Sequence, residues 1–168
     1  KTLTGPTVIA TASRDESRAW VKRMGADHVV DHRQALRPQL TAAGHEHVDY
    51  VLCTADTDPY FDMLAELVAP QGVLCFIVPP TIALDMAPLH TKSASVVWEL
   101  MYTRSMFQTK DMAEQRRILT DVARALDAGT LRSTLTRRLR PISAATLREA
   151  HAQIETGTTI GKIALEGW

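Results

Sequence analysis

The chain has 168 residues, enough for one domain with a sizeable core, and its 19 Lys and Arg residues balance 19 Asp and Glu residues. This zero net charge gives no electrostatic case for binding nucleic acid or an anionic membrane, and no apolar run approaches the roughly 20 residues of a membrane helix. The two cysteines, Cys53 and Cys75, lie in apolar runs without a CxxC pair. We expect buried free thiols, a reducing cytoplasmic location and no structural zinc.

The start of the chain predicts a strand, a helix and a second strand. Thr7–Thr11 is short and rich in β-branched residues, which is typical of a buried parallel strand. Ser13 is expected to cap a helix over Arg14–Met24, with Glu16 at the spacing of a capping box. His28–Val30 then predicts a short second strand.

The middle of the chain continues this alternation. Pro38 interrupts the next stretch, so only a short helix over Gln39–Ala43 is expected there. The later elements are a buried strand at Val48–Cys53, a helix from Pro59 to Val68, a turn at Pro70-Gln71-Gly72, a strand at Val73–Val78, an irregular segment at Leu84–His90 and a strand at Ser93–Met101.

The last third predicts a long helix and a smaller strand–helix–strand unit. The expected elements are a helix at Asp111–Ala128, a strand at Leu135–Leu139, a helix at Ala144–Glu155 capped by Ser143, and a strand at Lys162–Leu165. Strands that alternate with helices predict an α/β fold with a doubly wound, mostly parallel sheet, here as a single domain over residues 1–168.

Residues that directly follow the strands of such a sheet are the candidate ligand-binding positions. Ser13, Arg14 and Arg18 follow the first strand, where a hydroxyl, a helix N-terminus and a guanidinium suit a phosphate. Such residues at this strand end are typical of sites for the 2′-phosphate of NADP, whereas NAD sites place an acidic residue there. The alternative is that Ser13 is only a helix cap and Arg14 a solvated residue.

The other strand ends supply weaker candidates. His32 can stack on an adenine, although a surface histidine is the simpler interpretation. Thr54 and Ala55 are small enough for a ribose or nicotinamide to approach, or they form an ordinary turn. Phe76, Ile77 and Val78 can line an apolar wall, although core packing is the simpler interpretation for Ile77.

Other chemistries have little support. His45 and His47 flank Glu46, but two such histidines without a third ligand do not make a zinc site. No Ser-His-Asp set or GxSxG elbow indicates a hydrolase. We also find no catalytic residue for proton or hydride transfer in this chain.

The run TVIATASRDESRAWVKRMGADHVVDHRQ resembles the middle of the cofactor domain of medium-chain dehydrogenases/reductases, in the quinone oxidoreductase-like branch often labelled zinc-type alcohol dehydrogenase-like. The similarity continues in order through VDYVLCTADTD, PQGVLCFIV, KSASVVWELMYTRSMFQTKDM, RALDAGTLRSTLTRRLRPISAATLREAHAQIETG and GKIALEG, and covers essentially the whole chain.

This resemblance implies a Rossmann-like cofactor domain that lacks its first strand, glycine-rich loop and first helix, together with a GroES-like catalytic domain, in a protein of about twice this length. It implies NADPH-dependent reduction of a quinone or of an activated carbonyl or alkene, with the small-molecule substrate bound through the missing domain. We expect this chain alone to be inactive and to bind cofactor weakly. Ser93–Met101 resembles the edge strand that pairs two protomers in the family, which implies a homodimer.

The resemblance also assigns roles by position. Ser13 and Arg14 match the 2′-phosphate site, and His32 matches a position beside the adenosine. Thr54–Ala55 and Phe76–Val78 match the loops that line the ribose and the nicotinamide. Some relatives carry a Lys one position past Arg18, where this chain has Ala19, so Arg14 or Arg18 is expected to take that role. Some relatives also have a basic residue near Gly157, which this chain lacks, so NADH stays open as the less favoured cofactor.

Two other classes of protein stay open. One is a non-catalytic dinucleotide-sensing or scaffold domain that has lost its phosphate loop. The other is a methyltransferase-like α/β domain, although Ser13-Arg14 replaces the acidic residue that such a domain usually places near its ribose site.

Overall fold

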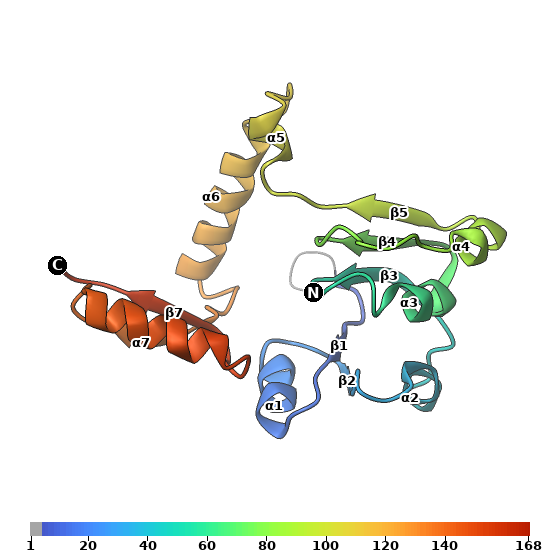
Figure 1. The fold of residues 1–168 in the computed structure, drawn as a ribbon, viewed down its shortest axis with the longest axis horizontal. Coiled ribbons are helices and arrows are strands. Elements are labelled where there is room, and N and C mark those ends of the chain that lie inside the picture. Colours follow the sequence, from blue (N-terminus) through green and yellow to red (C-terminus); the bar gives the residue numbers. More distant parts are fainter. Residues whose placement is uncertain (1–4) are drawn as a thin grey trace. The chain divides into compact units, whose positions relative to one another are not determined.

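The computed structural model describes residues 5–168, which divide into two compact units. The first combines the residues up to Arg33 with Gln115–Trp168, and the second is Gln34–Glu114. Each unit is described by itself, with the element labels of Figure 1. The single domain expected from the sequence stays a prediction.

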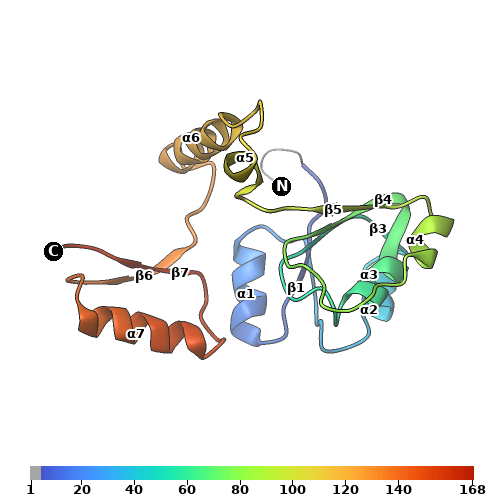
Figure 2. The ribbon, with the colours of Figure 1, turned by 45° about the horizontal axis from the view of Figure 1, so that its top comes forward.

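The first unit contains two pairs of parallel strands. Its elements are β1 (Ile9–Thr11), α1 (Asp15–Arg23), β2 (His28–Val30), α6 (Glu114–Asp127), β6 (Leu135–Leu139), α7 (Ala144–Glu155) and β7 (Lys162–Leu165), with Glu114 of α6 counted in the second unit. β1 pairs with β2, and β6 pairs with β7. α7 runs along the β6–β7 pair in Figure 2. Its cap is confirmed, because the Ser143 hydroxyl accepts from the Thr146 N–H.

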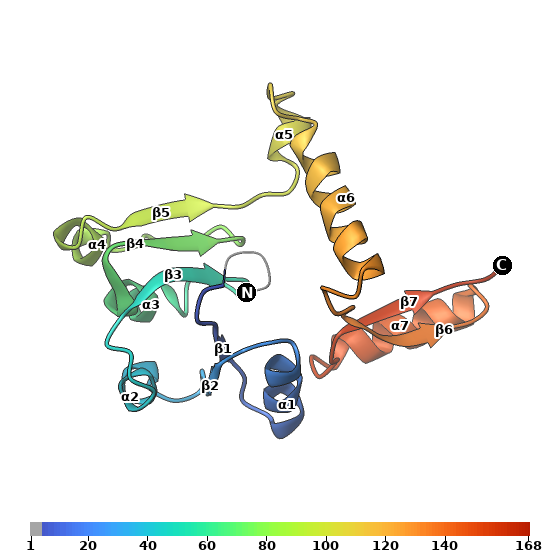
Figure 3. The same cartoon turned by 180° about the vertical axis from the view of Figure 1, so that it is seen from behind.

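The second unit is built on one three-stranded parallel sheet. Its elements are α2 (Leu36–Ala42), β3 (Val48–Cys53), α3 (Phe61–Leu67), β4 (Val68–Phe76), α4 (Ala87–Thr91), β5 (Ser95–Trp98) and α5 (Thr103–Met106). The order is β3-β4-β5, and Figure 3 shows the three arrows pointing the same way. The sheet and α3 enclose a core whose fully buried aromatic residues are Phe61 and Phe76, with ring centroids 5.8 Å apart.

Several predicted boundaries are wrong, each for a local reason. α2 begins at Leu36 and contains Pro38, which the first turn of a helix tolerates because its N–H groups need no partner inside the helix. The segment predicted as irregular contains α4, which has Pro88 in its first turn. The predicted strand Ser93–Met101 shortens to β5, and α5, which was not predicted, follows it.

The predicted turn at Pro70-Gln71-Gly72 lies inside β4. The β3–β4 register is interrupted there, since Val48 pairs with Val68 but Tyr50 pairs with Val73. Gly72 is required at this irregularity, because a Cβ on it would lie 2.8 Å from the Asp49 carbonyl oxygen and 2.7 Å from a Val68 methyl carbon. The turn residues therefore bend a continuous strand instead of ending a helix.

The expectation that β3 is buried is wrong for one of its faces. Val51 and Cys53 face the core, but Tyr50 is 79% exposed and Leu52 is 66% exposed. Side chains alternate between the two faces of a strand, so both exposed residues share the face that α3 does not cover. Cys53 is buried as expected, whereas Cys75 is half-buried, and both are free thiols.

No helix within residues 5–168 is both long enough and apolar enough to cross a membrane. The part of the chain that the structure describes is a mixed α/β arrangement in which each strand pair is parallel, as the alternation of elements predicts.

Truncating the central core ring should destabilise the protein strongly. Phe76 has no exposed surface and contacts the rings of Phe61 and Trp98. We expect Phe76→Ala to lower the free energy of unfolding in urea by about 3–5 kcal/mol, because it removes buried surface and leaves a cavity. Phe107→Ala serves as the control, since Phe107 is 73% exposed, and should change stability by about 0.5 kcal/mol or less. Equal losses for the two variants would contradict the assignment of this core.

Candidate functional site

The N-terminus of α1 lies one residue later than the sequence predicts. Arg14, not Ser13, is the N-cap residue, and Ser17 replaces Glu16 in the reciprocal contact. The Ser17 hydroxyl accepts from the Arg14 N–H at 3.2 Å and donates to the Arg14 carbonyl at 2.8 Å. The Ser13 hydroxyl therefore does not cap the helix, and it has no hydrogen-bond partner among residues 5–168.

The Arg14 guanidinium is held by a distant part of the same unit. Its Nη2 donates to the Thr158 carbonyl at 3.1 Å, in the loop that follows α7. One of its five N–H donors is used in this contact, so four stay available to a ligand. Sequence spacing gives no sign of this contact, because the two residues are 144 positions apart.

Arg33 is a candidate that the sequence analysis did not select. Its Nη2 donates to the Ser13 carbonyl, which brings a second guanidinium to the end of β1. Its backbone N–H and Nε also donate to the Asp31 carboxylate, at 2.9 and 3.3 Å. These hydrogen bonds lower the pKa of Asp31 and raise the pKa of Arg33, so the pair stays ionised. The available signal was its position just after β2, where ligand-binding residues of such a sheet are expected.

The other predicted residues of this unit have different surroundings. Arg18 donates to the carbonyls of Ala12 and Val29, at 3.1 and 3.4 Å, and so ties the ends of β1 and β2 together. Nδ1 of His32 is buried and has no hydrogen-bond partner in the described chain. A buried polar atom without a partner is costly unless a ligand or water satisfies it, which fits a binding position.

The remaining predicted residues belong to the second unit. Thr54 and Ala55 directly follow β3 and are exposed. Phe76 ends β4 with its ring in the core, and Val78 is half-buried. Ile77 is 41% exposed, so the expectation that it belongs to the core is wrong. Thus Ser13, Arg14, Arg18 and His32 lie in one unit, and Thr54–Ala55 and Phe76–Val78 lie in the other.

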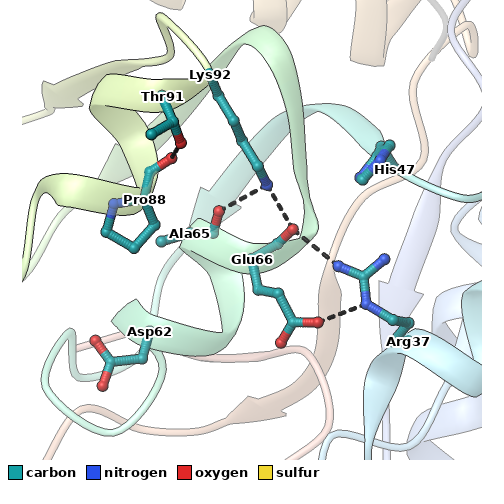
Figure 4. A pocket seen from close by; sticks show the side chains of 8 residues that line it. All are labelled: Arg37, His47, Asp62, Ala65, Glu66, Pro88, Thr91 and Lys92. Atoms are coloured by element: carbon teal, nitrogen blue, oxygen red, sulfur yellow. Dashed lines mark hydrogen bonds and ion pairs between the residues drawn. The ribbon is translucent and has the colours of Figure 1, made fainter.

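The second unit has a pocket of about 320 Å³ at the end of α3, and none of the predicted site residues lines it (Figure 4). The Lys92 ammonium donates to the carbonyls of Ala65, Glu66 and Val68 at 2.6–3.0 Å. Arg37 binds both the Glu66 carboxylate and the Glu66 carbonyl, at 2.6 and 2.9 Å. These cations satisfy the last carbonyls of α3, so the pocket is a helix C-terminus closed by its own chain.

Metal-binding chemistry has no cluster to support it in the described part of the chain. No group of three or more His, Cys, Asp or Glu side chains is close enough to hold a metal ion within residues 5–168. The described residues therefore do not by themselves form a site for a zinc ion.

A family profile described as zinc-binding dehydrogenase matches residues 24–165. The chain belongs to this family. A zinc-type alcohol dehydrogenase-like protein from Staphylococcus aureus strain MSSA476 is 35% identical over 161 residues, which cover 96% of this chain and 48% of that protein. The chain thus spans about half the length of the curated relatives it matches.

Solved structures agree with this assignment. A protein from Rhizobium etli CFN 42, described as a zinc-dependent alcohol dehydrogenase, is 48% identical with a TM-score of 0.90, over 99% of this chain and 48% of that chain. An NAD-dependent alcohol dehydrogenase shares the fold, with 22% identity and a TM-score of 0.76 over 98% of this chain and 45% of that chain. A mycobacterial protein complexed with NADPH also shares it, with 21% identity and a TM-score of 0.74 over 95% of this chain and 48% of that chain. The resemblance to medium-chain dehydrogenases/reductases and the α/β fold class are confirmed.

Removing Arg33 should change the titration of its partner. In Arg33→Ala the pKa of Asp31 should rise toward its ordinary value, because the hydrogen bonds from the guanidinium are lost. A lowered pKa in the folded state stabilises the protein above the unfolded pKa, and this contribution disappears as the pH falls through the folded pKa. An NMR titration of the Asp31 carboxyl carbon measures the effect, with Arg37→Ala as the control. An unchanged Asp31 titration would contradict the assigned pair.

Proposed function

We propose that this chain is the cofactor-binding part of an NADPH-dependent oxidoreductase that reduces a quinone or an activated carbonyl or alkene. The observation that supports it most directly is the end of β1. A Ser13 hydroxyl without a partner among residues 5–168, the N-cap residue Arg14 and the N-terminus of α1 directly follow β1, and the Arg33 guanidinium donates to the Ser13 carbonyl. Hydroxyl, guanidinium and helix N–H donors are the groups that bind phosphate, so this end suits the 2′-phosphate of NADPH.

The proposal gives each part of the chain a binding role. Ser13 and Arg14 bind the 2′-phosphate, and Arg33 adds positive charge beside them. His32, whose buried Nδ1 has no partner in the described residues, forms a hydrogen bond with the adenosine end of the cofactor. Arg18 holds the strand ends in place. Thr54, Ala55, Ile77 and Val78 form the ribose and nicotinamide side. The bound nicotinamide supplies the hydride, and the rest of a longer protein supplies the glycine-rich loop, the substrate pocket and the catalytic residues.

A non-catalytic dinucleotide-sensing domain is the alternative function. It requires the same contacts with the adenosine but no substrate domain. The two functions therefore differ in whether the gene also encodes a glycine-rich loop and a substrate domain. A GxGxxG motif together with a substrate domain favours the oxidoreductase. We further propose a cytoplasmic location, in keeping with the two free cysteines.

A homodimer through β5 also forms part of the proposal. Within the described sheet, β5 pairs only with β4, so its other edge is unpaired. Unpaired strand edges are templates for pairing with another chain. The exposed apolar residues Val97, Trp98 and Met101 on and after β5 add surface that a second copy would bury.

The role of Arg14 predicts a cofactor-selective loss. In the protein as its gene encodes it, NADPH should bind more tightly than NADH, and Arg14→Ala should reduce this difference by about 1–3 kcal/mol, the scale of a hydrogen bond to a charged group. Titration calorimetry with both cofactors measures the effect. The exposed helix residue Arg23→Ala serves as the control. Equal losses of affinity for NADPH and NADH in Arg14→Ala would contradict the role of Arg14 in binding the 2′-phosphate.

A charge on the proposed dimer edge should separate the protomers. Val97→Lys places an ammonium on the edge strand, where it opposes pairing with a second strand. Size-exclusion chromatography with light scattering should give the dimer mass for the unmodified protein and the monomer mass for the variant. Tyr50→Lys, on the exposed face of β3, should leave the mass unchanged. A monomeric unmodified protein would contradict the dimer.

A further inference from the structure

Two loops at the end of the second unit's sheet are tied together by side chains that the sequence analysis did not select. β3 and β4 are parallel neighbours, with Cys53 opposite Phe76. The loop after β3 covers residues 54–60, and the loop after β4 covers residues 77–86. Because the strands are parallel, both loops leave the same edge of the sheet.

Thr57 makes the buried contact between these loops. The residue is only 1% exposed, and its hydroxyl donates to the Val78 carbonyl at 2.5 Å. Its own carbonyl accepts from the N–H groups of Tyr60 and Phe61, at 3.1 and 3.0 Å, so it is anchored to the start of α3. The buried Thr57 side chain therefore restrains the position of the Val78 carbonyl.

Asp58 makes a second contact beside the first. Its carboxylate accepts from the Thr81 backbone N–H at 3.0 Å and from the Thr81 hydroxyl at 2.5 Å. On the β3 side, the Cys53 thiol lies 3.7 Å from the Ala55 carbonyl. Hydrogen bonds therefore restrain the start and the centre of both loops.

We propose that Thr57 and Asp58 are positioning residues for the nicotinamide half of the cofactor. They fix Ile77 and Val78 in the second loop relative to Thr54 and Ala55 in the first. This inference rests on the proposed function, because it assumes that these four residues line the cofactor. Neither positioning residue touches the reacting atoms.

The contacts are better suited to placing the loops than to holding the fold. The strands are already joined by the β3–β4 ladder, and α3 is held on β4 by the packing of Phe61 against Phe76. Losing the Thr57 hydroxyl leaves the Val78 carbonyl without its partner, and such a carbonyl regains a partner only if the loop moves. The expected consequence is a displaced loop on an intact sheet.

The test uses two ligands that differ in the half of the site they occupy. NADPH reaches the nicotinamide side, whereas adenosine 2′,5′-bisphosphate carries only the adenosine end with its 2′-phosphate. In the protein as its gene encodes it, Thr57→Val should weaken NADPH binding by about 5- to 20-fold, the scale of one lost hydrogen bond with an unsatisfied carbonyl. Binding of adenosine 2′,5′-bisphosphate should change by less than about twofold.

Conservative and control variants separate positioning from general damage. Thr57→Ser keeps the hydroxyl and should restore NADPH affinity to within about twofold. Thr91→Val removes a threonine hydroxyl that bonds a carbonyl within α4 and should change neither affinity. If Thr57→Val does not fold, Thr81→Val removes the hydroxyl bond to Asp58 at an exposed position and should weaken NADPH alone by about 2- to 5-fold.

The outcomes distinguish this inference from the function on which it rests. Unchanged NADPH binding in both variants, or equal losses for the two ligands, overturns the positioning role and leaves the proposed function intact. A native protein that binds neither ligand overturns the proposed function, and the positioning role with it.

Discussion

The parallel pairing of β3 with β4 is the constraint on which the candidate loops of the second unit depend. With Cys53 opposite Phe76, the two strands end at the same level, so the loops that follow them leave one edge together. Antiparallel strands would send these loops to opposite edges. The buried contact between Phe61 and Phe76 packs α3 on β4, and the hydrogen bonds of Thr57 and Asp58 connect the two loops.

The distribution of satisfied and unsatisfied polar groups separates structural cations from candidate ligand-binding ones. Lys92 uses its ammonium on three carbonyls at the end of α3, and Arg37 closes the same helix end. Both cations there close the end of the helix, although His47, which lines the same pocket, has a buried Nδ1 without a hydrogen-bond partner in the described residues. At the ends of β1 and β2, the Ser13 hydroxyl and the His32 Nδ1 have no partner in the described residues, and Arg14 uses one donor.

The elements that were predictable carried strong local signals. The strands Leu135–Leu139 and Lys162–Leu165 and the helix Ala144–Glu155 have the predicted bounds, since periodicity and the Ser143 cap agree there. One error arose where tertiary pairing overrides a local signal. Pro70-Gln71-Gly72 has the composition of a turn, yet the ladder with β3 keeps it inside a strand. Another error was local, because the N-cap of α1 is Arg14 and not Ser13, and Ser17 takes the place of Glu16 in the reciprocal contact.

The sequence by itself determined the parallel α/β class, the family and the strand ends at which the candidate residues lie. These follow from hydrophobic periodicity and from the order of motifs, which are properties of neighbouring residues. The tertiary structure decided which side chains are free and which are occupied. Arg33 beside Ser13, Arg14 on Thr158, and Thr57 on Val78 are contacts between residues 20, 144 and 21 positions apart. Hydrogen bonding depends on distance in space, which spacing along the chain does not reveal at such separations.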